Sequence, residues 1–257
     1  MTFHWYEYLI AIVGSMIAGG INTLAGNGST ITLTILMEVL GLPETVANAT
    51  NRVGIFTQNM ASTLSYHKNG KLDLGKNKLY ILLIVTGAIM GVIAAAKISN
   101  EGFAQVFRYL MVVMLLVVLV KPSRWLKEAR PERPLPLWLS IPLFLALGFY
   151  GGFVQMGFGI FFLAVMVLGA NFSFLESNVL KSAVILIYTF IVLAIFHYKG
   201  LINWQIGALM AVGQTTGGYL TAEFAVKYPD SNKWAYRVLV FVIVVALLRL
   251  FGFFDLF

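Results

Sequence analysis

The chain contains two long stretches without a charged residue, one between Glu7 and Glu38 and the other between Arg133 and Glu176. A helix crosses the ~30 Å hydrocarbon core of a bilayer in about 20 apolar residues, so each stretch is too long for a single straight crossing. Only 11% of the 257 residues are charged, whereas soluble domains carry about 25%. A water-soluble fold of this length would lack the polar surface to cover its core. The sequence therefore predicts an all-α integral membrane protein.

Glycine-rich segments interrupt both charge-free stretches near their middle, at 18–29 and at 150–159. We expect a broken helix or a re-entrant hairpin at each. No Lys or Arg precedes Arg52, so the first stretch lacks the basic region of a signal peptide, and we expect it to belong to the mature fold. Other apolar segments have the length of single transmembrane helices. These segments are 45–66, 77–96, 104–120, 175–196, 204–223 and 235–251.

The two halves of the chain repeat each other. Gly19-Gly20 matches Gly151-Gly152, and Gly26 and Gly28 match Gly157 and Gly159. Further along, three pairs share a spacing of 130 residues: His67 with His197, Gly70 with Gly200, and Gly87 with Gly217. Internal duplication is typical of secondary transporters, whose substrate site lies between the repeats near the bilayer midplane. We expect repeats at 1–120 and 135–257, joined by a basic cytoplasmic linker at 121–134.

Charged loops predict the orientation of the helices. The loops 67–78, 121–134 and 224–237 are rich in Lys and Arg, whereas 97–103 and 197–203 contain one Lys each. Basic loops stay in the cytoplasm, which requires an odd number of crossings in each half. We therefore expect two inverted repeats, each a glycine-broken helix or hairpin plus three transmembrane helices. Both termini would be extracytoplasmic, in the inner membrane of a bacterium.

Two cations lie deep within predicted spans. Arg52 is eight residues from Glu44, and Lys181 is eight residues from Ser173, which is roughly 12 Å along a helix. Such residues are costly in lipid and face an interior or a water-filled cavity. A structural role would require a buried carboxylate partner, and no Asp or Glu lies deep in any predicted span. An anionic substrate is the remaining counter-charge, so neutralising either cation should weaken anion binding while the fold survives.

Polar side chains accompany these cations. The glycine breaks carry amides and hydroxyls, and a helix that begins inside the membrane exposes backbone N–H groups that attract anions. Asn48 and Asn51 lie within one helical turn of Arg52, as Asn178 does of Lys181. The segment from Ser173 to Glu176 has the pattern of a helix capping box. The candidate substrate-binding residues are Asn22, Thr23, Gly26, Asn27, Gly28, Ser29, Asn48, Asn51, Arg52, Gln155, Gly157, Gly159, Asn178 and Lys181.

Other functional classes are not supported. Three scattered His and peripheral acids offer no catalytic pair or metal cluster, and the chain has no Cys. We therefore expect no enzyme activity, no cofactor and no metal. The net charge of +7 is explained by the membrane loops, so no nucleic-acid partner is expected. The expected partners are the lipid bilayer and a small anion, with proton or sodium coupling left open.

One region resembles a known family. The segment 18–29, the triplet Gly41-Leu42-Pro43 and the segment 47–52 together resemble the sulfite exporter TauE/SafE family, and the resemblance extends over the whole chain. It implies a permease that exports sulfite or organosulfonates such as sulfoacetate. A passive anion channel, or a permease for another small organic anion, remains the alternative because fixed positive charge also suits a pore.

Overall fold

The structure is a computed structural model that describes residues 4–98, 136–170 and 172–228, with a few positions between 230 and 241. The described residues form helices and no strands. In chain order the elements are α1 (Trp5–Ala25), α2 (Gly28–Thr34), η1 (Ile35–Val39), α3 (Glu44–Lys68), η2 (Gly75–Asn77), α4 (Lys78–Ala95), α6 (Leu137–Phe153), α7 (Phe158–Leu163), η4 (Ala164–Gly169), α8 (Phe174–Tyr198) and α9 (Trp204–Lys227). The predicted span 104–120, nearly all of 235–251 and the linker 121–134 lie outside the described residues.

Four predicted transmembrane helices are confirmed as α3, α4, α8 and α9. By length and composition, α1, α4 and α8 are apolar enough to cross a membrane. The helices α3 and α9 have 25 and 24 residues, which is also long enough to cross, but they are more polar. Their polar side chains are largely buried within the bundle. The predicted capping box is present, because Ser173 Oγ accepts from the Glu176 N–H while Glu176 Oε2 accepts from the Ser173 N–H.

Both predicted helix breaks are confirmed. α1 ends at Gly26, whose φ of 80° lies in the left-handed region. The chain then returns along α1, since Gly28 lies against Ala18 and Ile35 reaches Gly14. In the second half, four residues separate α6 from α7. Each returning arm ends in a π-helical turn, η1 or η4, a rare conformation that often marks functional sites.

The spacing of 130 residues between the halves is also visible in local geometry. Gly70 and Gly200 end α3 and α8 with φ of 66° and 67°. In both cases the glycine N–H donates to a carbonyl three residues earlier, and the next N–H donates to one five residues earlier. Identical turns at this spacing support the duplication inferred from the sequence.

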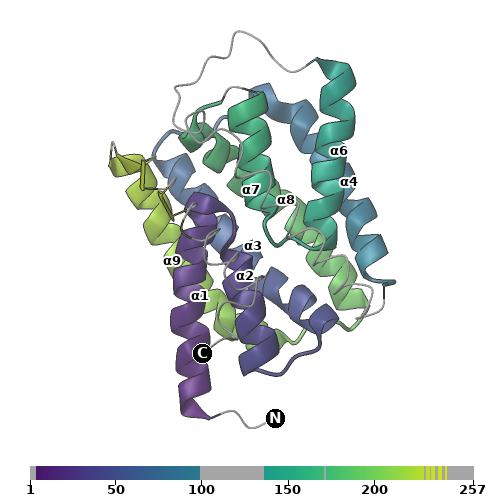
Figure 1. Ribbon diagram of the computed structural model, residues 1–257, viewed down its shortest axis with the longest axis vertical. Coiled ribbons are helices and arrows are strands. Elements are labelled where there is room, and N and C mark those ends of the chain that lie inside the picture. The colour runs from purple at the N-terminus through teal and green to yellow at the C-terminus, as the bar shows by residue number, and fades with distance from the viewer. Residues whose placement is uncertain are drawn as a thin grey trace.

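The halves pack mainly against each other. α1 lies beside α9, and α6 lies beside α4 (Figure 1). Small residues allow the close approach, as a Cβ added at Gly217 would overlap the backbone of α1 at Met16, and one at Gly152 would overlap α4 at Ala88. Such glycine contacts are a common mode of helix packing in membranes.

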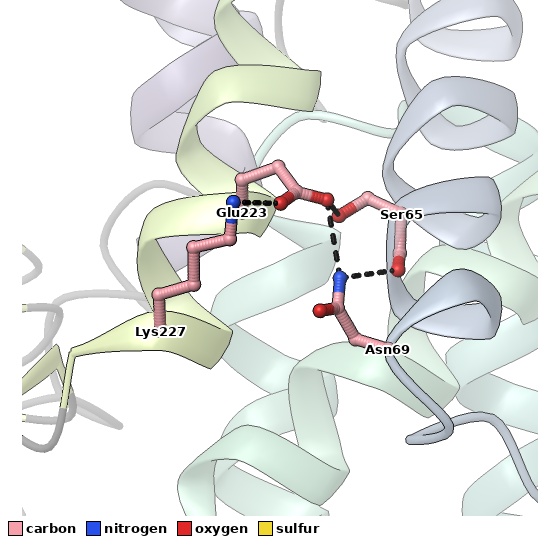
Figure 2. A network of polar contacts seen from close by, with 4 residues as sticks. All are labelled: Ser65, Asn69, Glu223 and Lys227. Atoms are coloured by element: carbon pink, nitrogen blue, oxygen red, sulfur yellow. Dashed lines mark hydrogen bonds and ion pairs between the residues drawn. The ribbon is translucent and has the colours of Figure 1, made fainter.

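Side-chain contacts define the relative directions of the central helices. α3 and α9 run parallel, because Thr57 bonds to Thr215 and, further along both helices, Ser65 bonds to Glu223 (Figure 2). α3 and α8 run antiparallel, because Val53 and Tyr66 near the two ends of α3 cluster with Leu193 and Val179, respectively. Corresponding helices of the two halves thus point in opposite directions, as the inverted-repeat prediction requires. The placement of the repeats in a membrane stays a prediction.

Candidate functional site

Lys181, in the middle of α8, lies at the end of α1. Its Nζ donates to the carbonyls of Asn22 and Thr23, each at 2.9 Å, and to Asn178 Oδ1 at 2.6 Å. The side chain is 1% exposed. An ammonium group has three N–H donors, so all three are used in this arrangement.

Arg52 on α3 makes the corresponding contacts at the end of α6. Its Nη1 donates to the carbonyl of Gly151 at 2.8 Å, and its Nη2 donates to that of Gly152 at 3.1 Å. Nη1 also donates to Gln155 Oε1. The side chain is fully buried. Each cation of one half therefore binds the broken helix of the other half.

Two asparagines complete the pattern. Asn48 Nδ2 donates to the carbonyl of Phe153, and Asn178 Nδ2 donates to that of Leu24, both at 3.2 Å. Each broken helix thus has three successive carbonyls bound by the opposite half, two by a cation and one by an asparagine. We call these two sets of contacts the crossed caps. The α1 cap consists of Lys181 and Asn178, and the α6 cap consists of Arg52 and Asn48.

The crossed caps have a clear physical basis. The last carbonyls of a helix have no partner within the helix and carry the negative end of its dipole. In a buried position, leaving them unpaired would cost free energy. The sequence analysis considered only carboxylates as structural partners for the two cations. The structure supplies backbone carbonyls instead, so the cations are hydrogen-bonded without an acid.

The two breaks touch at Gly26 and Gly159, where a Cβ on either residue would overlap the backbone of the other. Next to this contact, Gln155 adopts a φ of 68°, a strained conformation for a residue with a side chain. Its Oε1 accepts hydrogen bonds from both Arg52 and Tyr188. Tyr188 thereby ties α8 to the break of its own half.

The first break has an equivalent tie to α3. Gln58 accepts from Asn22 Nδ2 and donates to Thr23 Oγ1, both at 3.2 Å. Gln58 and Tyr188 are 130 residues apart, so the repeat spacing could have identified both, yet the sequence analysis did not select them. It also missed Gln214 on α9, whose Nε2 donates to Asn51 Oδ1 at 3.3 Å.

Three buried nitrogen atoms near the breaks have no hydrogen-bond partner among the described residues. They are Asn27 Nδ2, Asn51 Nδ2 and Arg52 Nε, and all three can only donate. Buried donors without acceptors are rare in folded proteins. Some acceptor-capable groups are also unpaired, Asn48 Oδ1 and several hydroxyls. The unpaired nitrogens are nevertheless the atoms that a bound anion would satisfy.

All fourteen predicted site residues are buried. Hydrogen bonds or backbone contacts link most of them across the two breaks. Asn27 and Ser29 differ, since their hydrogen bonds run only to Thr30 and Thr32 within the same short segment. Among the residues that the structure describes, no group of His, Cys, Asp and Glu is arranged to hold a metal ion.

Comparison with known proteins agrees with this architecture. The family model described as sulfite exporter TauE/SafE matches residues 11–250. A probable membrane transporter protein, ORF9, from Sinorhizobium sp. is 26% identical over 88% of this chain and 85% of its own length. The probable membrane transporter protein YfcA from Escherichia coli (strain K12) is 25% identical over 79% of this chain and 75% of its own length. No solved structure matches the chain.

The family model covers almost the whole sequence, including both glycine breaks and both crossed caps. The chain therefore belongs to the sulfite exporter TauE/SafE family of membrane transporters.

Proposed function

We propose that this protein is a secondary transporter that exports small sulfur-containing anions, such as sulfite or organosulfonates. The observation that carries the proposal is the group of three unpaired buried donors, Asn27 Nδ2, Asn51 Nδ2 and Arg52 Nε. Two of them belong to adjacent residues on α3. An oxyanion offers several acceptors at once, and hydrogen bonds to a charged acceptor are stronger than neutral ones.

The local charge supports an anion as the ligand. Arg52 and Lys181 are both buried, and neither forms an ion pair with a carboxylate among the described residues. Lys181 uses all three of its N–H donors in the α1 cap, so it would attract the anion through its charge. Arg52 keeps Nε unpaired and would bind the anion directly.

The arrangement of the halves supports a carrier. The breaks meet at Gly26 and Gly159, and each crossed cap joins the two halves. A site between oppositely directed repeats can open to one side at a time when one repeat moves against the other. The transporter would work in the inner membrane with both termini outside, and the site would lie near the bilayer midplane.

A ligand panel tests the substrate class. Purified protein in detergent is heated with sulfite, a sulfonate series including sulfoacetate, sulfate, or carboxylates of matched size. A ligand that binds only the folded state raises its apparent stability, by about 2.7 kcal/mol at 100 times its dissociation constant. We expect sulfite or a sulfonate to raise the melting temperature most. A carboxylate that stabilises the protein while every sulfur anion fails would replace the proposed class.

A matched pair of variants tests the location of the site. Asn51→Ala removes an unpaired donor and should weaken binding of the stabilising anion roughly tenfold, the effect of about 1.4 kcal/mol. Asn59→Ala is the control, because Asn59 lies on the same helix, is equally buried, and donates to its own helix at Ile55. Equal affinities in the two variants would place the site elsewhere.

The competing anion channel is tested by flux. In proteoliposomes, a carrier shows saturable exchange, and an outward gradient of cold substrate drives uptake of labelled substrate. A channel follows the electrochemical gradient and saturates poorly. If transport persists unchanged after both proton and sodium gradients are dissipated, the protein works by facilitated diffusion without ion coupling.

A further inference from the structure

The contacts of Lys181 resemble the surroundings of a bound metal cation more than those of an anion-binding lysine. We propose that the end of α1 and Asn178 form a monovalent-cation site, which Lys181 fills with its own ammonium group. The transporter then needs no sodium ion at this position. This inference does not depend on which anion is carried.

Three oxygen atoms surround Lys181 Nζ. Two are the backbone carbonyls of Asn22 and Thr23, and the third is Asn178 Oδ1. Carbonyl and amide oxygens at the unwound or C-terminal end of a broken helix are the groups that coordinate sodium in many carriers. All of these residues are at most 5% exposed. The oxygens are neutral, so the single positive charge of Lys181 has no paired anion in the cap.

The α6 cap shows that this third oxygen is specific to Lys181. There, Asn48 donates to a carbonyl as Asn178 does, but Asn48 Oδ1 has no partner. Arg52 instead uses the separate nitrogens of its guanidinium for the two carbonyls. Only the α1 cap brings three oxygens to a single nitrogen, which is the arrangement that a small cation requires.

The charge at this position also has a structural task. Carbonyls at the end of α1 carry the negative end of the helix dipole, and the break at Gly26 exposes them inside the protein. A free sodium ion would fulfil this task only when bound, whereas a tethered ammonium is always present. Loss of the ammonium should therefore leave a vacant site that a small external cation can occupy.

The variant Lys181→Ala tests this directly. The probe is ammonium, which has the size and the N–H donors of the lysine head group, supplied as chloride and compared with N-methyl-D-glucamine chloride at equal concentration. Melting temperatures are measured on purified protein in detergent. We expect ammonium to raise the melting temperature of Lys181→Ala by ~5 °C or more at saturation. The parent protein should not respond, since its site is filled.

Two further arms make the result decisive. Lys181→Met fills the space of the lysine without its charge, so ammonium should not stabilise it. Lys181→Ala should be extracted and purified in both salts, because a variant that needs the cation would be recovered folded only in ammonium. Sodium and potassium are then compared with ammonium to rank the cations that the site accepts.

The outcomes separate clearly. Selective stabilisation or selective recovery of Lys181→Ala by ammonium supports the proposal. A folded Lys181→Ala that ignores ammonium overturns it, as does a variant recovered folded in neither salt or an equal response by the parent. In proteoliposomes, anion flux by the parent should be unchanged when N-methyl-D-glucamine replaces sodium. A parent that requires sodium would overturn the claim that Lys181 takes the place of the ion.

Discussion

Gly26 and Gly159 lie backbone against backbone, one at the break of each half, and neither leaves space for a side chain on the other. Their contact joins two hairpins that are far apart in the sequence. Beside it lie the two crossed caps, in which α3 binds the end of α6 and α8 binds the end of α1. Any movement of one half against the other must change this contact.

Gly159→Ala should test how tightly the breaks are joined. Gly159 follows the first residue of α7, where alanine is compatible with the backbone, so the effect should come from overlap with Gly26 alone. Overpacking a buried contact typically costs about 1–3 kcal/mol, which we expect as a lower melting temperature. Gly75→Ala, in an exposed turn with space for a methyl group, is the control. Equal melting temperatures of the two variants would mean that the breaks separate without cost.

Arg52→Gln should weaken anion binding at least tenfold, about 1.4 kcal/mol, because it removes both the charge and the unpaired Nε. From the sequence alone, we expected the fold to be unaffected. The structure changes that expectation, since Arg52 binds two buried carbonyls that glutamine cannot both reach. Unpaired buried groups cost about 1–3 kcal/mol, so the melting temperature should also fall.

The matched control for Arg52→Gln is Lys68→Gln, which removes a positive charge at the exposed end of the same helix. It should change neither anion affinity nor stability. Lys181→Gln should show the same loss of stability as Arg52→Gln, because it opens the other cap. An Arg52→Gln protein that binds the anion as tightly as the parent would make Arg52 a purely structural residue.

Much of the fold could be predicted from the sequence because lipid imposes simple rules. Apolar segments of about 20 residues bounded by polar loops correspond to α3, α4, α8 and α9. The glycine breaks were recognisable because glycine is rare in the interior of a helix unless the backbone must bend or approach another chain segment. The capping box at Ser173 was readable because its chemistry is local.

The partners of the buried cations could not be predicted in the same way. Arg52 and the carbonyl of Gly151 are 99 residues apart, and every residue offers a backbone carbonyl, so no residue type signals the contact. The same limit applies to Gln214, which reaches Asn51 only because α9 packs along α3. Side-chain types identified which groups were unusual, and tertiary packing decided what they bind.

The absence of cysteine makes the membrane topology directly testable. Lys71→Cys and Lys199→Cys place single thiols in exposed loops after α3 and α8. Because these helices run antiparallel, the two thiols should lie on opposite sides of the membrane. An impermeant maleimide added to intact cells should label Lys199→Cys, while Lys71→Cys should react only after lysis. Labelling of both variants in intact cells would contradict the inverted-repeat topology, and terminal reporter fusions provide an independent check.

Glu223 connects the halves a second time, away from the breaks. Its Oε1 accepts from Ser65 Oγ at 2.7 Å and from Asn69 Nδ2 at 3.1 Å, both on α3 (Figure 2). On its other oxygen, Lys227 of the same helix forms an ion pair at 2.8 Å. The parallel helices α3 and α9 are thus joined at their C-terminal ends by a carboxylate, which we call the α3–α9 clamp.

Ser65→Ala should loosen the α3–α9 clamp more than Lys227→Ala does. Ser65 is fully buried, and its hydrogen bond to a carboxylate is of the stronger kind, so we expect a loss of about 1.5 kcal/mol and a melting temperature lower by several degrees. The Lys227 side chain is 62% exposed, and an exposed ion pair contributes little because water and salt screen it. High salt should therefore affect the parent and Lys227→Ala equally. A larger loss of stability in Lys227→Ala than in Ser65→Ala would mean that the ion pair, and not the contact between the halves, holds Glu223 in place.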